Sequence, residues 1–532
     1  MENLQNNQIL INGFLNSVNQ RPGSIALDVN NCLYTYAEMH EASVNIANAI
    51  VKHQHSANNY TAILASNSLS AYTGILGALL IGKTYVPLNK KNPVLRTWDM
   101  LNRSGANTLV VGKECLEYFI ELLPLLKSAL TVVLPDTANT DDLQLKYPQH
   151  KFCFSNEQDL QKEEYSELTQ NTNPIAYLLF TSGSTGIPKG VQVTNENVCA
   201  YLNYISDRFD FSATDKFSQT FPLAFDLSVH DMFLCWKVGA CLCVPSEDAS
   251  PALLSSFIKE KNITVWFSVP SLALLLMKMR LLKNNVFPSL RFSLFCGEAL
   301  TEKVTFQWQQ AALNSRILNL YGPTEATIAI ACYEWKKSQE LNFCINGIVP
   351  IGKVFNTQNF CIVDENKKQV NFGENGELLL SGTQISPGYL DDQENIKKQY
   401  MKLPGFGDNV WYKTGDLVRE DEQNNLHFSG RIDSQVKIRG FRVELLEIDN
   451  AIRKIVNNDW VATVVEEHND TLYSFICKNP SETEISESEI LAYCRTVLPW
   501  YMIPGKLVFI EKMPLNNNGK IDRNKLKDLI KC

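Results

Sequence analysis

The sequence is poor in histidine, has no long uninterrupted apolar run and carries no excess of basic charge. Its 7 histidines and 14 scattered cysteines lack the paired spacings of a structural zinc site, and Cys241 and Cys243 stand apart from any histidine partner. We therefore expect mostly buried, reduced thiols. Because 57 acidic residues outnumber 49 basic ones, for a net charge of -8, the composition argues against a broad surface for nucleic-acid phosphates.

Segments for secretion or membrane insertion are also missing. Residues 1–7 lack the basic segment and apolar core of a secretory signal, so we expect a cytoplasmic protein. The most apolar stretches, such as residues 263–277, fall short of a bilayer-spanning helix; this one is interrupted by Thr264, Ser268, Pro270 and Ser271. We expect no membrane span.

What the sequence does contain is the composition of a large folded protein. At 532 residues it exceeds what one hydrophobic core usually supports, so two or more domains are expected. A helix-like stretch at 36–51 alternates with apolar runs at 61–65 and 108–111, which predicts an α/β fold. Further apolar runs look like buried strands that mostly end in Gly, Ser or Pro turns: 176–180, 265–269, 290–295 and 317–320.

The residue pattern changes in the last third of the chain. From about residue 347 it is rich in glycine and short apolar runs, which predicts a smaller barrel-like or antiparallel lobe; the runs are 360–363, 376–381, 411–412 and 426–429. Near residues 431–433 the pattern shifts to a strand at 436–438, a turn at Gly440 and a helix at 445–455. We place the domain boundary there, giving domains 1–432 and 433–532.

A loop rich in glycine and hydroxyl groups follows the apolar run at 176–180. It consists of Thr181, Ser182, Gly183, Ser184, Thr185 and Gly186, and Lys189 comes shortly after. Glycines let backbone N–H groups approach phosphate oxygens, hydroxyls add donors and a lysine adds positive charge. The spacing is not that of a Walker loop, and a flexible surface loop is the alternative.

Several motifs in one order carry a family resemblance that spans nearly the whole chain. They are residues 177–191, LYGPTE at 320–325, YKTGD at 412–416, GRID at 430–433 and NGKIDR at 518–523. With them the chain resembles the adenylate-forming superfamily, and within it the amino-acid adenylation domains of nonribosomal peptide synthetases and the D-alanine:carrier-protein ligases. The resemblance implies a large N-terminal domain of layered αβ sheets plus a β-barrel. A small α+β C-terminal domain would swing about a hinge, which we place at Asp433.

The resemblance also implies roles for residues in these motifs. Tyr321 would stack on adenine, Thr324 would contact the α-phosphate and Glu325 would hold Mg²⁺. Asp416 would accept both ribose hydroxyls, with Arg431 in support. Polar turns are the alternative reading of these motifs. The implied nucleotide site further includes Gly297, Glu298, Ala299 and Gly322.

Two lysines have implied catalytic roles. Lys520 would reach into the site during adenylation and neutralise charge on the phosphate and carboxylate oxygens. Lys437 would serve the second half-reaction, in which a thioester forms on a phosphopantetheine thiol. A solvated lysine is the alternative for both.

By the resemblance, Asp226 would distinguish amino-acid substrates from other acids. From the residues alone it could be a helix N-cap; the resemblance implies that it binds the α-ammonium group. Residues four apart share a helix face, so His230 should point the same way. By motif, the substrate pocket is lined by Leu227, His230, Phe267, Leu294, Cys296, Leu320, Ile328 and Ala329. These mostly apolar walls favour a small or medium apolar amino acid, with alanine of either hand first, although His230 could favour a polar or bulkier one.

The expected activity is therefore the ATP- and Mg²⁺-dependent activation of an amino acid. We find no condensation-type motif upstream and no carrier motif downstream, so we expect a free-standing ligase that loads a separate carrier protein bearing a phosphopantetheine arm. The alternatives are an acyl- or aryl-coenzyme A ligase, a D-alanine:carrier-protein ligase of cell-wall modification, and an inactive homologue.

Overall fold

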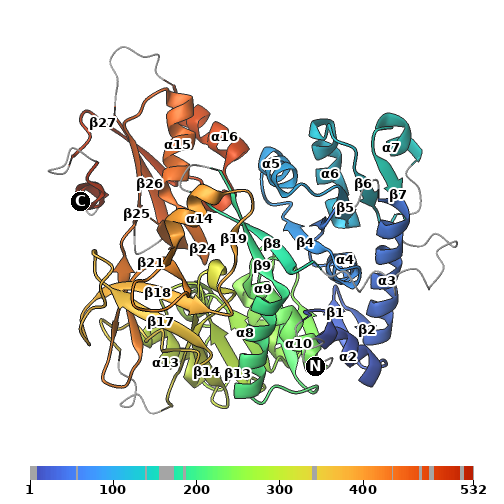
Figure 1. The fold of residues 1–532 in the computed structure, drawn as a ribbon, viewed down its shortest axis with the longest axis horizontal. Coiled ribbons are helices and arrows are strands. Elements are labelled where there is room, and N and C mark those ends of the chain that lie inside the picture. Colours follow the sequence, from blue (N-terminus) through green and yellow to red (C-terminus); the bar gives the residue numbers. More distant parts are fainter. Residues whose placement is uncertain are drawn as a thin grey trace.

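The computed structural model describes residues 9–54, 58–137, 141–154, 173–183, 187–337, 344–433, 435–466, 470–477, 485–515 and 521–530. Two large sheets form the N-terminal part of the chain, and a smaller group of elements from the C-terminal part lies against them (Figure 1). The mixed α/β architecture predicted from the sequence is confirmed.

One large sheet has eight strands in the order β19-β9-β8-β4-β3-β5-β6-β7. Its core is parallel, and β9 and β19 extend one edge in the antiparallel sense. The strands are β3 (Tyr60–Leu64), β4 (Thr84–Leu88), β5 (Thr108–Val111), β6 (Thr131–Val133), β7 (Lys151–Cys153), β8 (Ile175–Thr181), β9 (Lys189–Thr194) and β19 (Gly388–Tyr389). Every residue of β4 is buried, as expected for a parallel strand covered on both faces.

The other large sheet has nine strands in the order β16-β15-β14-β13-β12-β10-β11-β1-β2. These are β1 (Ile25–Val29), β2 (Cys32–Thr35), β10 (Lys216–Ser218), β11 (Cys241–Val244), β12 (Val265–Ser268), β13 (Phe292–Phe295), β14 (Arg316–Tyr321), β15 (Ala331–Glu334) and β16 (Lys353–Val354). Strands β12, β13 and β14 are parallel, so their carboxyl ends meet at one edge, where ligands of α/β sheets gather.

Helices cover both sheets. They are α2 (Asn12–Gln20), α3 (Tyr36–His53), α4 (Leu69–Leu80), α5 (Val94–Ser104), α6 (Leu116–Leu122), α7 (Asp141–Lys146), α8 (Asn195–Arg208), α9 (Leu227–Val229), η4 (His230–Leu234), α10 (Cys235–Lys237), α11 (Pro251–Glu260), α12 (Pro270–Lys278) and α13 (Glu302–Ala311). Local signals start some of them: Thr35 and Glu38 form a capping box at α3. Helix α4 is buried from Ser70 to Leu80, which explains why its sequence is apolar all round.

The glycine-rich region forms the predicted antiparallel lobe. Its strands are β17 (Gln358–Val363), β18 (Gly376–Gly382), β20 (Tyr400–Lys402), β21 (Val410–Glu420) and β22 (Leu426–Arg431), and α14 (Gln393–Gln399) precedes β20. Strand β21 pairs with β18, β20 and β22, so it is the centre of this sheet.

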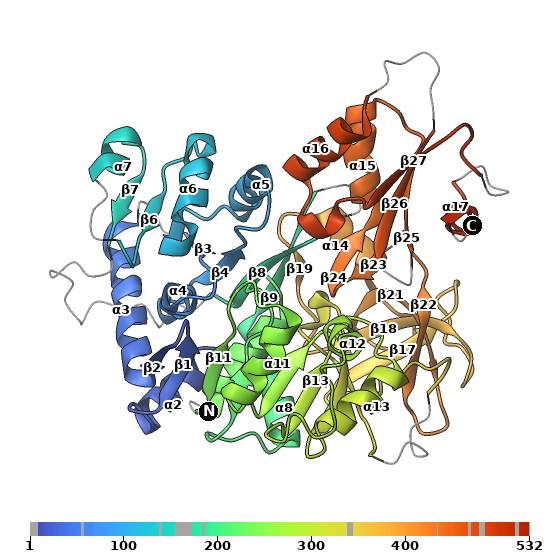
Figure 2. The same ribbon diagram turned by 180° about the vertical axis from the view of Figure 1, so that it is seen from behind.

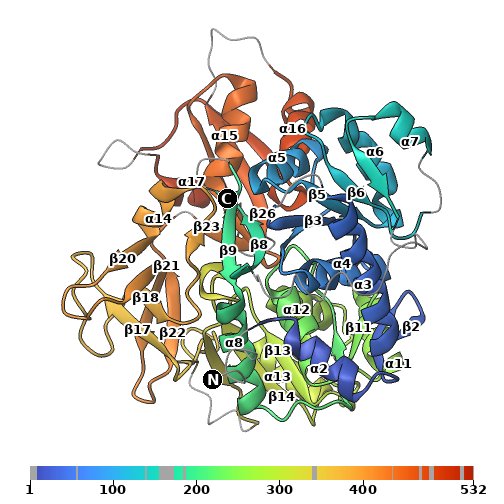
Figure 3. The ribbon, with the colours of Figure 1, turned by 45° about the vertical axis from the view of Figure 1, so that its right-hand side comes forward.

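The C-terminal elements have hydrophobic cores of their own. They comprise the hairpin β23 (Gln435–Ile438) and β24 (Phe441–Glu444), a sheet of β25 (Val461–Glu466), β26 (Thr471–Cys477) and β27 (Lys506–Ile510), and the helices α15 (Leu445–Val456), α16 (Glu487–Val497) and α17 (Arg523–Ile530). The buried residues of the two clusters here all come from Ile438 onward. Helix α16 lies beside α5 of the N-terminal part (Figures 2 and 3). No helix in the described ranges is long and apolar enough to cross a membrane.

Candidate functional site

A cavity lies where β8, β13 and β14 end, and the C-terminal hairpin β23–β24 closes it from the other side. The structure thus brings together segments that are hundreds of residues apart in the chain. The predicted site residues that line the cavity are Thr181, Ser182, Asp226, Leu227, Cys296, Gly297, Tyr321, Gly322, Thr324, Asp416, Arg431 and Lys437.

Other predicted residues do not line this cavity. Six pocket residues lie within the surrounding core, each at most 2% exposed: His230, Phe267, Leu294, Leu320, Ile328 and Ala329. Ala299 is exposed to solvent outside the cavity. The predictions for Ser184, Thr185, Gly186 and Lys520 lie outside the described residues.

The glycine-rich loop starts as a tight turn at the end of β8. A Cβ at Gly183 would overlap the carbonyl oxygen of Ile187, so only glycine fits there. The Ser182 hydroxyl donates to the carbonyl oxygen of Arg442 at 2.7 Å, and the Gly183 N–H donates to Glu447 at 3.3 Å. Both partners belong to the C-terminal part, so these donors are already engaged in this arrangement.

Lys189 lies across the β8–β9 turn from the loop. It pairs with Thr181 in the ladder, and its Nζ lies 5.6 Å from the centre of the Tyr389 ring. This contact places a positive charge beside the loop, over an aromatic face that favours cations.

Glu325 is a buried carboxylate, 1% exposed, in the short 3-10 helix Thr324–Ala326 that follows β14. Arg442 donates to one of its oxygens at 2.8 Å and the Tyr389 hydroxyl to the other at 2.7 Å. Burial raises the pKa of Glu325, but the Arg442 charge and the Tyr389 hydrogen bond outweigh burial and hold it below its ordinary value. Glu325 is therefore ionised at neutral pH.

The turn after Glu325 is strained. Thr327 and Ile328 both adopt positive φ angles, of 58° and 70°, which β-branched residues rarely adopt. The Thr327 hydroxyl donates to the carbonyl oxygen of Gln384 at 2.6 Å, and Gln384 in turn donates to the carbonyl oxygen of Ala329 at 2.8 Å. Such strain costs about 1 to 3 kcal/mol per residue and concentrates at functional sites.

Asp416 is the centre of a hydrogen-bonded chain. The Tyr321 hydroxyl donates to it at 2.5 Å, and the Arg431 guanidinium pairs with its other oxygen. Arg431 also makes a bidentate pair with Asp433, at 2.8 and 2.9 Å. The predicted ribose carboxylate and the predicted hinge residue are thus joined through one arginine.

Asp226 stands at the start of α9, yet its side chain makes no capping hydrogen bond. This observation contradicts the N-cap alternative and leaves the carboxylate facing the cavity. Burial raises the pKa of Asp226 to about 6, although a hydrogen bond from Thr324 and the charge of Lys437 act against the rise. A buried carboxylate of this kind is stabilised by a cationic ligand.

His230 lies behind the cavity wall and is fully buried. Its Nδ1 is 2.7 Å from the Tyr201 hydroxyl, and its ring packs edge-on against Phe267, with centroids 4.8 Å apart. Burial lowers the pKa of His230 to about 3, so it is neutral at physiological pH. These contacts hold the side chain within the protein core.

The hairpin β23–β24 inserts its turn into the site. The Gly440 N–H donates to Glu298 at 2.5 Å, and the other oxygen of Glu298 accepts from the Ser271 N–H at 2.8 Å. Gly440 has a φ of +83°, and a Cβ there would overlap Val269. Glu298, predicted to bind nucleotide, contacts the hairpin in this arrangement.

The sequence did not reveal several residues of the site. Arg442 pairs with Lys437 across the hairpin. Apolar and charged residues alternate along β24, and this alternation was the sequence signal that could have indicated Arg442. Arg96 on α5 and Tyr501 also line the cavity, and Phe441 stacks on Tyr501 with centroids 3.8 Å apart. Nothing in the sequence links Arg96 to this region, because it approaches the site only through folding.

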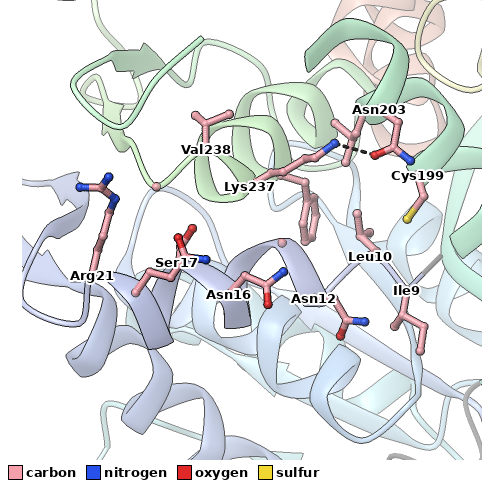
Figure 4. Close-up of a pocket in the computed structure, with 15 residues that line it drawn as sticks. Ile9, Leu10, Asn12, Asn16, Ser17, Arg21, Cys199, Asn203, Lys237 and Val238 are labelled. Atoms are coloured by element: carbon pink, nitrogen blue, oxygen red, sulfur yellow. Dashed lines mark hydrogen bonds between the residues drawn. The ribbon is translucent and has the colours of Figure 1, made fainter. Parts of the chain in front are cut away.

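A second cavity lies beneath α2 (Figure 4). Lys237 projects into it and donates to Asn203 at 2.6 Å and to Ser206 at 2.8 Å. None of the predicted site residues that the structure describes lines this cavity.

Comparison with protein families decides the class of this site. Residues 14–390 match the family described as AMP-binding enzyme. The chain belongs to this family. It is an adenylate-forming enzyme, as the motifs around Tyr321 and Asp416 predicted.

Relatives within the family include ligases of several kinds. A D-alanine–D-alanyl carrier protein ligase from Bacillus licheniformis is 33% identical over 362 residues, 66% of this chain and 70% of its own length. An L-proline–[L-prolyl-carrier protein] ligase from Pseudomonas fluorescens is 30% identical over 86% of each chain. Zwittermicin A synthase ZmaJ from Bacillus cereus is 28% identical over 96% of this chain and 93% of its own length.

A solved structure matches the whole fold. The adenylation domain AlmE from Vibrio cholerae, in complex with glycyl-adenosine-5'-phosphate, is 31% identical, with a TM-score of 0.87 over 98% of this chain and 97% of AlmE. The predicted fold class is confirmed by this match.

Proposed function

We propose that the protein adenylates a small amino acid and transfers it to the phosphopantetheine thiol of a separate carrier protein. In the first half, a carboxylate oxygen attacks the α-phosphorus of ATP, the bond to pyrophosphate breaks and an aminoacyl-adenylate forms. In the second half, the thiol loses its proton and attacks the carbonyl carbon, AMP leaves and a thioester forms.

The observation that carries this proposal is the carboxylate of Asp226. It is 8% exposed, caps no helix and faces the cavity. An amino acid brings an ammonium group that offsets the cost of burying this charge, whereas a fatty or aryl acid brings none. Asp226 therefore favours amino-acid activation over the acyl- or aryl-coenzyme A ligase alternative.

The remaining roles are those that the resemblance to the adenylate-forming superfamily implies. Tyr321 contacts adenine, Asp416 and Arg431 bind the ribose, and Thr324 binds the α-phosphate. The loop 181–186 with Lys189 holds the outer phosphates. Lys437 acts in the second half and Lys520 in the first. Residues 1–432 and 433–532 form the two domains, with the hinge at Asp433.

Glu325 is the residue that would hold Mg²⁺. Its low pKa keeps it an oxygen anion, the ligand type that Mg²⁺ prefers. No group of three or more metal-binding side chains occurs in the described residues, so phosphate oxygens and water would complete the coordination. Bound there, Mg²⁺ would neutralise charge on the phosphates. Arg442 holds the same carboxylate in this structure and has to move away first.

The burial of the predicted pocket residues supports a small substrate. Phe267, Leu294, Leu320, Ile328 and Ala329 belong to the same hydrophobic cluster as Leu227, and His230 packs against Phe267. These six residues are at most 2% exposed and do not line the cavity, which leaves little room for a side chain among them. AlmE, which is similar along its whole length, is solved with a glycyl adenylate. We infer that glycine and alanine are the best candidates.

Amino-acid-dependent exchange of labelled pyrophosphate into ATP tests this function. We expect exchange with glycine or alanine, and weaker exchange with larger residues. Replacing Asp226 with Asn keeps the size of the side chain but removes its charge, and should lower kcat/KM for the amino acid about 100-fold, as expected when a buried ion pair worth about 3 kcal/mol is lost. Exchange with fatty or aryl acids and with no amino acid would overturn the proposal.

A further inference from the structure

The second cavity, beneath α2, combines positive charge with an apolar wall (Figure 4). Its volume is about 260 Å³, and its walls come from α2, α8 and the turn that follows α10. Lys237 and Arg21 are its charged lining residues, and none of the described residues that line it is Asp or Glu. The cavity is therefore suited to an anion rather than to a cation.

The ammonium group of Lys237 is held by neutral partners. Its Nζ donates to the Asn203 side-chain oxygen at 2.6 Å and to the Ser206 hydroxyl at 2.8 Å, and both partners lie on α8. An ammonium group has three N–H donors, so one is left for a ligand. Burial lowers the pKa of Lys237, while the charge of Asp207 acts against this shift. A partly desolvated cation with neutral partners is stabilised by an anionic ligand.

An apolar wall completes the lining of the cavity. Leu10, Cys199, Leu202 and Phe233 belong to it, and each is at most 7% exposed. Such side chains offer nothing to an inorganic anion, but they can cover a short hydrocarbon chain and remove it from water. Mostly apolar walls with a few placed polar groups are typical of sites for small organic ligands. The cavity is smaller than the roughly 300 Å³ at which such sites usually begin, so its ligand has to be small.

Close packing of α2 fixes the shape of the cavity. The Ser17 hydroxyl donates to the carbonyl oxygen of Trp236 at 2.5 Å. Gly13 lies against Lys237, because a Cβ at Gly13 would approach the Cβ of Lys237 to 3.1 Å. The walls are therefore in place before a ligand binds, which lowers the entropic cost of binding.

We propose that this cavity binds a small carboxylate with a short apolar chain, whose carboxylate pairs with Lys237 and whose chain lies along Leu202 and Phe233. Arg21, at the other end of the cavity in Figure 4, adds positive potential. The inference does not depend on the proposed function, because Lys237 does not line the cavity at the strand ends.

Calorimetric titration of the full-length protein with acetate, butyrate and hexanoate tests the ligand class. We expect the affinity to rise by up to about fourfold per added methylene group, the gain expected when such a group is buried. Hexan-1-ol lacks the charge and inorganic phosphate lacks the chain, so each should bind at least about tenfold more weakly than hexanoate. No binding of hexanoate at millimolar concentrations, equal affinities along the series, or phosphate binding as tight as that of hexanoate would overturn the proposal.

Variants of Lys237 locate the binding. Replacing Lys237 with Gln removes the charge and should weaken hexanoate binding at least about tenfold, as expected when a hydrogen bond to a charged group is lost. Lys237→Arg keeps the charge and should restore most of the affinity. Lys303→Gln makes the same charge change on the exposed side of α13 and should bind hexanoate as the wild type does. Unchanged affinity in folded Lys237→Gln would contradict the proposal.

A variant that fills the cavity provides an independent measure and keeps the test decisive if Lys237→Gln fails to fold. Asn16 lines the cavity from the exposed side of α2, so replacing it with Trp should occupy the space without removing the charge. We expect hexanoate affinity to fall at least about tenfold, the loss of most of the buried chain. Thermal melting shows that the variant is folded, and wild-type affinity in folded Asn16→Trp would place the hexanoate elsewhere and overturn the proposal.

Discussion

Asp226 combines burial with the nearby charge of Lys437, and this balance makes its charge sensitive to pH. Burial raises its pKa to about 6, well above that of an exposed aspartate. A histidine side chain ordinarily titrates near neutral pH. Burial lowers the pKa of His230 to about 3, so this side chain stays neutral. The pH dependence of amino-acid binding between pH 5 and 8 should therefore report on Asp226.

We expect kcat/KM for the amino acid to be constant above about pH 7 and to fall as pH drops through 6. Protonation of Asp226 in the free enzyme removes the partner of the ammonium group, and kcat/KM reports pKa values of the free enzyme. Initial rates of pyrophosphate exchange at subsaturating amino acid, from pH 5 to 8, provide the measurement. Asp226→Asn should lack this transition, and a flat profile in the wild type would contradict the assignment.

At the residue level, motifs pointed to cavity residues that lie in or shortly after a strand, but not to those that arrive through docking. Tyr321 ends β14, Thr324 follows it and Asp416 lies within β21, and each belongs to a short motif that the sequence displays. Arg96 and Glu447 meet although 351 positions separate them, and no local pattern encodes such a contact. The position of His230 behind the wall depends on its contact with Tyr201, which spacing along one helix does not reveal.

At the level of elements, the hairpin β23–β24 links the two parts of the chain. Apolar alternation predicted its first strand at 436–438, and the structure has β23 at Gln435–Ile438. The helix predicted at 445–455 is α15, Leu445–Val456. The π turn η4 was not predicted, because its hydrogen bonding follows from tertiary packing rather than from apolar spacing.

Replacing Gly440 with Ala should impair the second half-reaction selectively. A Cβ at Gly440 would overlap Val269, and the positive φ adds strain, so the hairpin could not dock as observed. We expect thioester formation on a carrier protein to fall about tenfold or more, a loss of about 1.4 kcal/mol, while amino-acid-dependent pyrophosphate exchange changes little.

The matched control is Gly373→Ala. Gly373 has a φ of +81°, close to that of Gly440, but a Cβ there would meet nothing within 4 Å. It therefore carries the same backbone strain without the contact. Equal loss of both half-reactions in Gly440→Ala, or equal loss of thioester formation in both variants, would show that docking of this turn is not required.

At the level of the whole molecule, the C-terminal elements have the features of an independent folding unit. Their two clusters are built from buried residues between Ile438 and Leu526, and their contacts with the N-terminal part include the ion pair of Glu447 with Arg96 and the aromatic pair of Phe441 with Phe225. Domains with their own core and few crossing contacts commonly fold alone.

We expect the fragment 435–532 to fold in isolation. Amide dispersion in a two-dimensional NMR spectrum and a cooperative thermal transition would show this. The fragment 445–532 is the control: it lacks Ile438 and Val443, which are buried in the same core, and should melt at a lower temperature. A disordered 435–532 fragment would place the boundary elsewhere.

The hydrogen bonds that join Asp416, Arg431 and Asp433 have a consequence for protein engineering. Arg431 and Asp433 form their bidentate pair just before the C-terminal elements begin. A chimaera that takes a relative's C-terminal segment from Gln435 onward would keep this pair intact at the graft junction. It would still need an acid where Glu447 stands, because Arg96 would otherwise be left buried without its counterion. Compatibility of donor segments can therefore be screened at that one position before any chimaera is made.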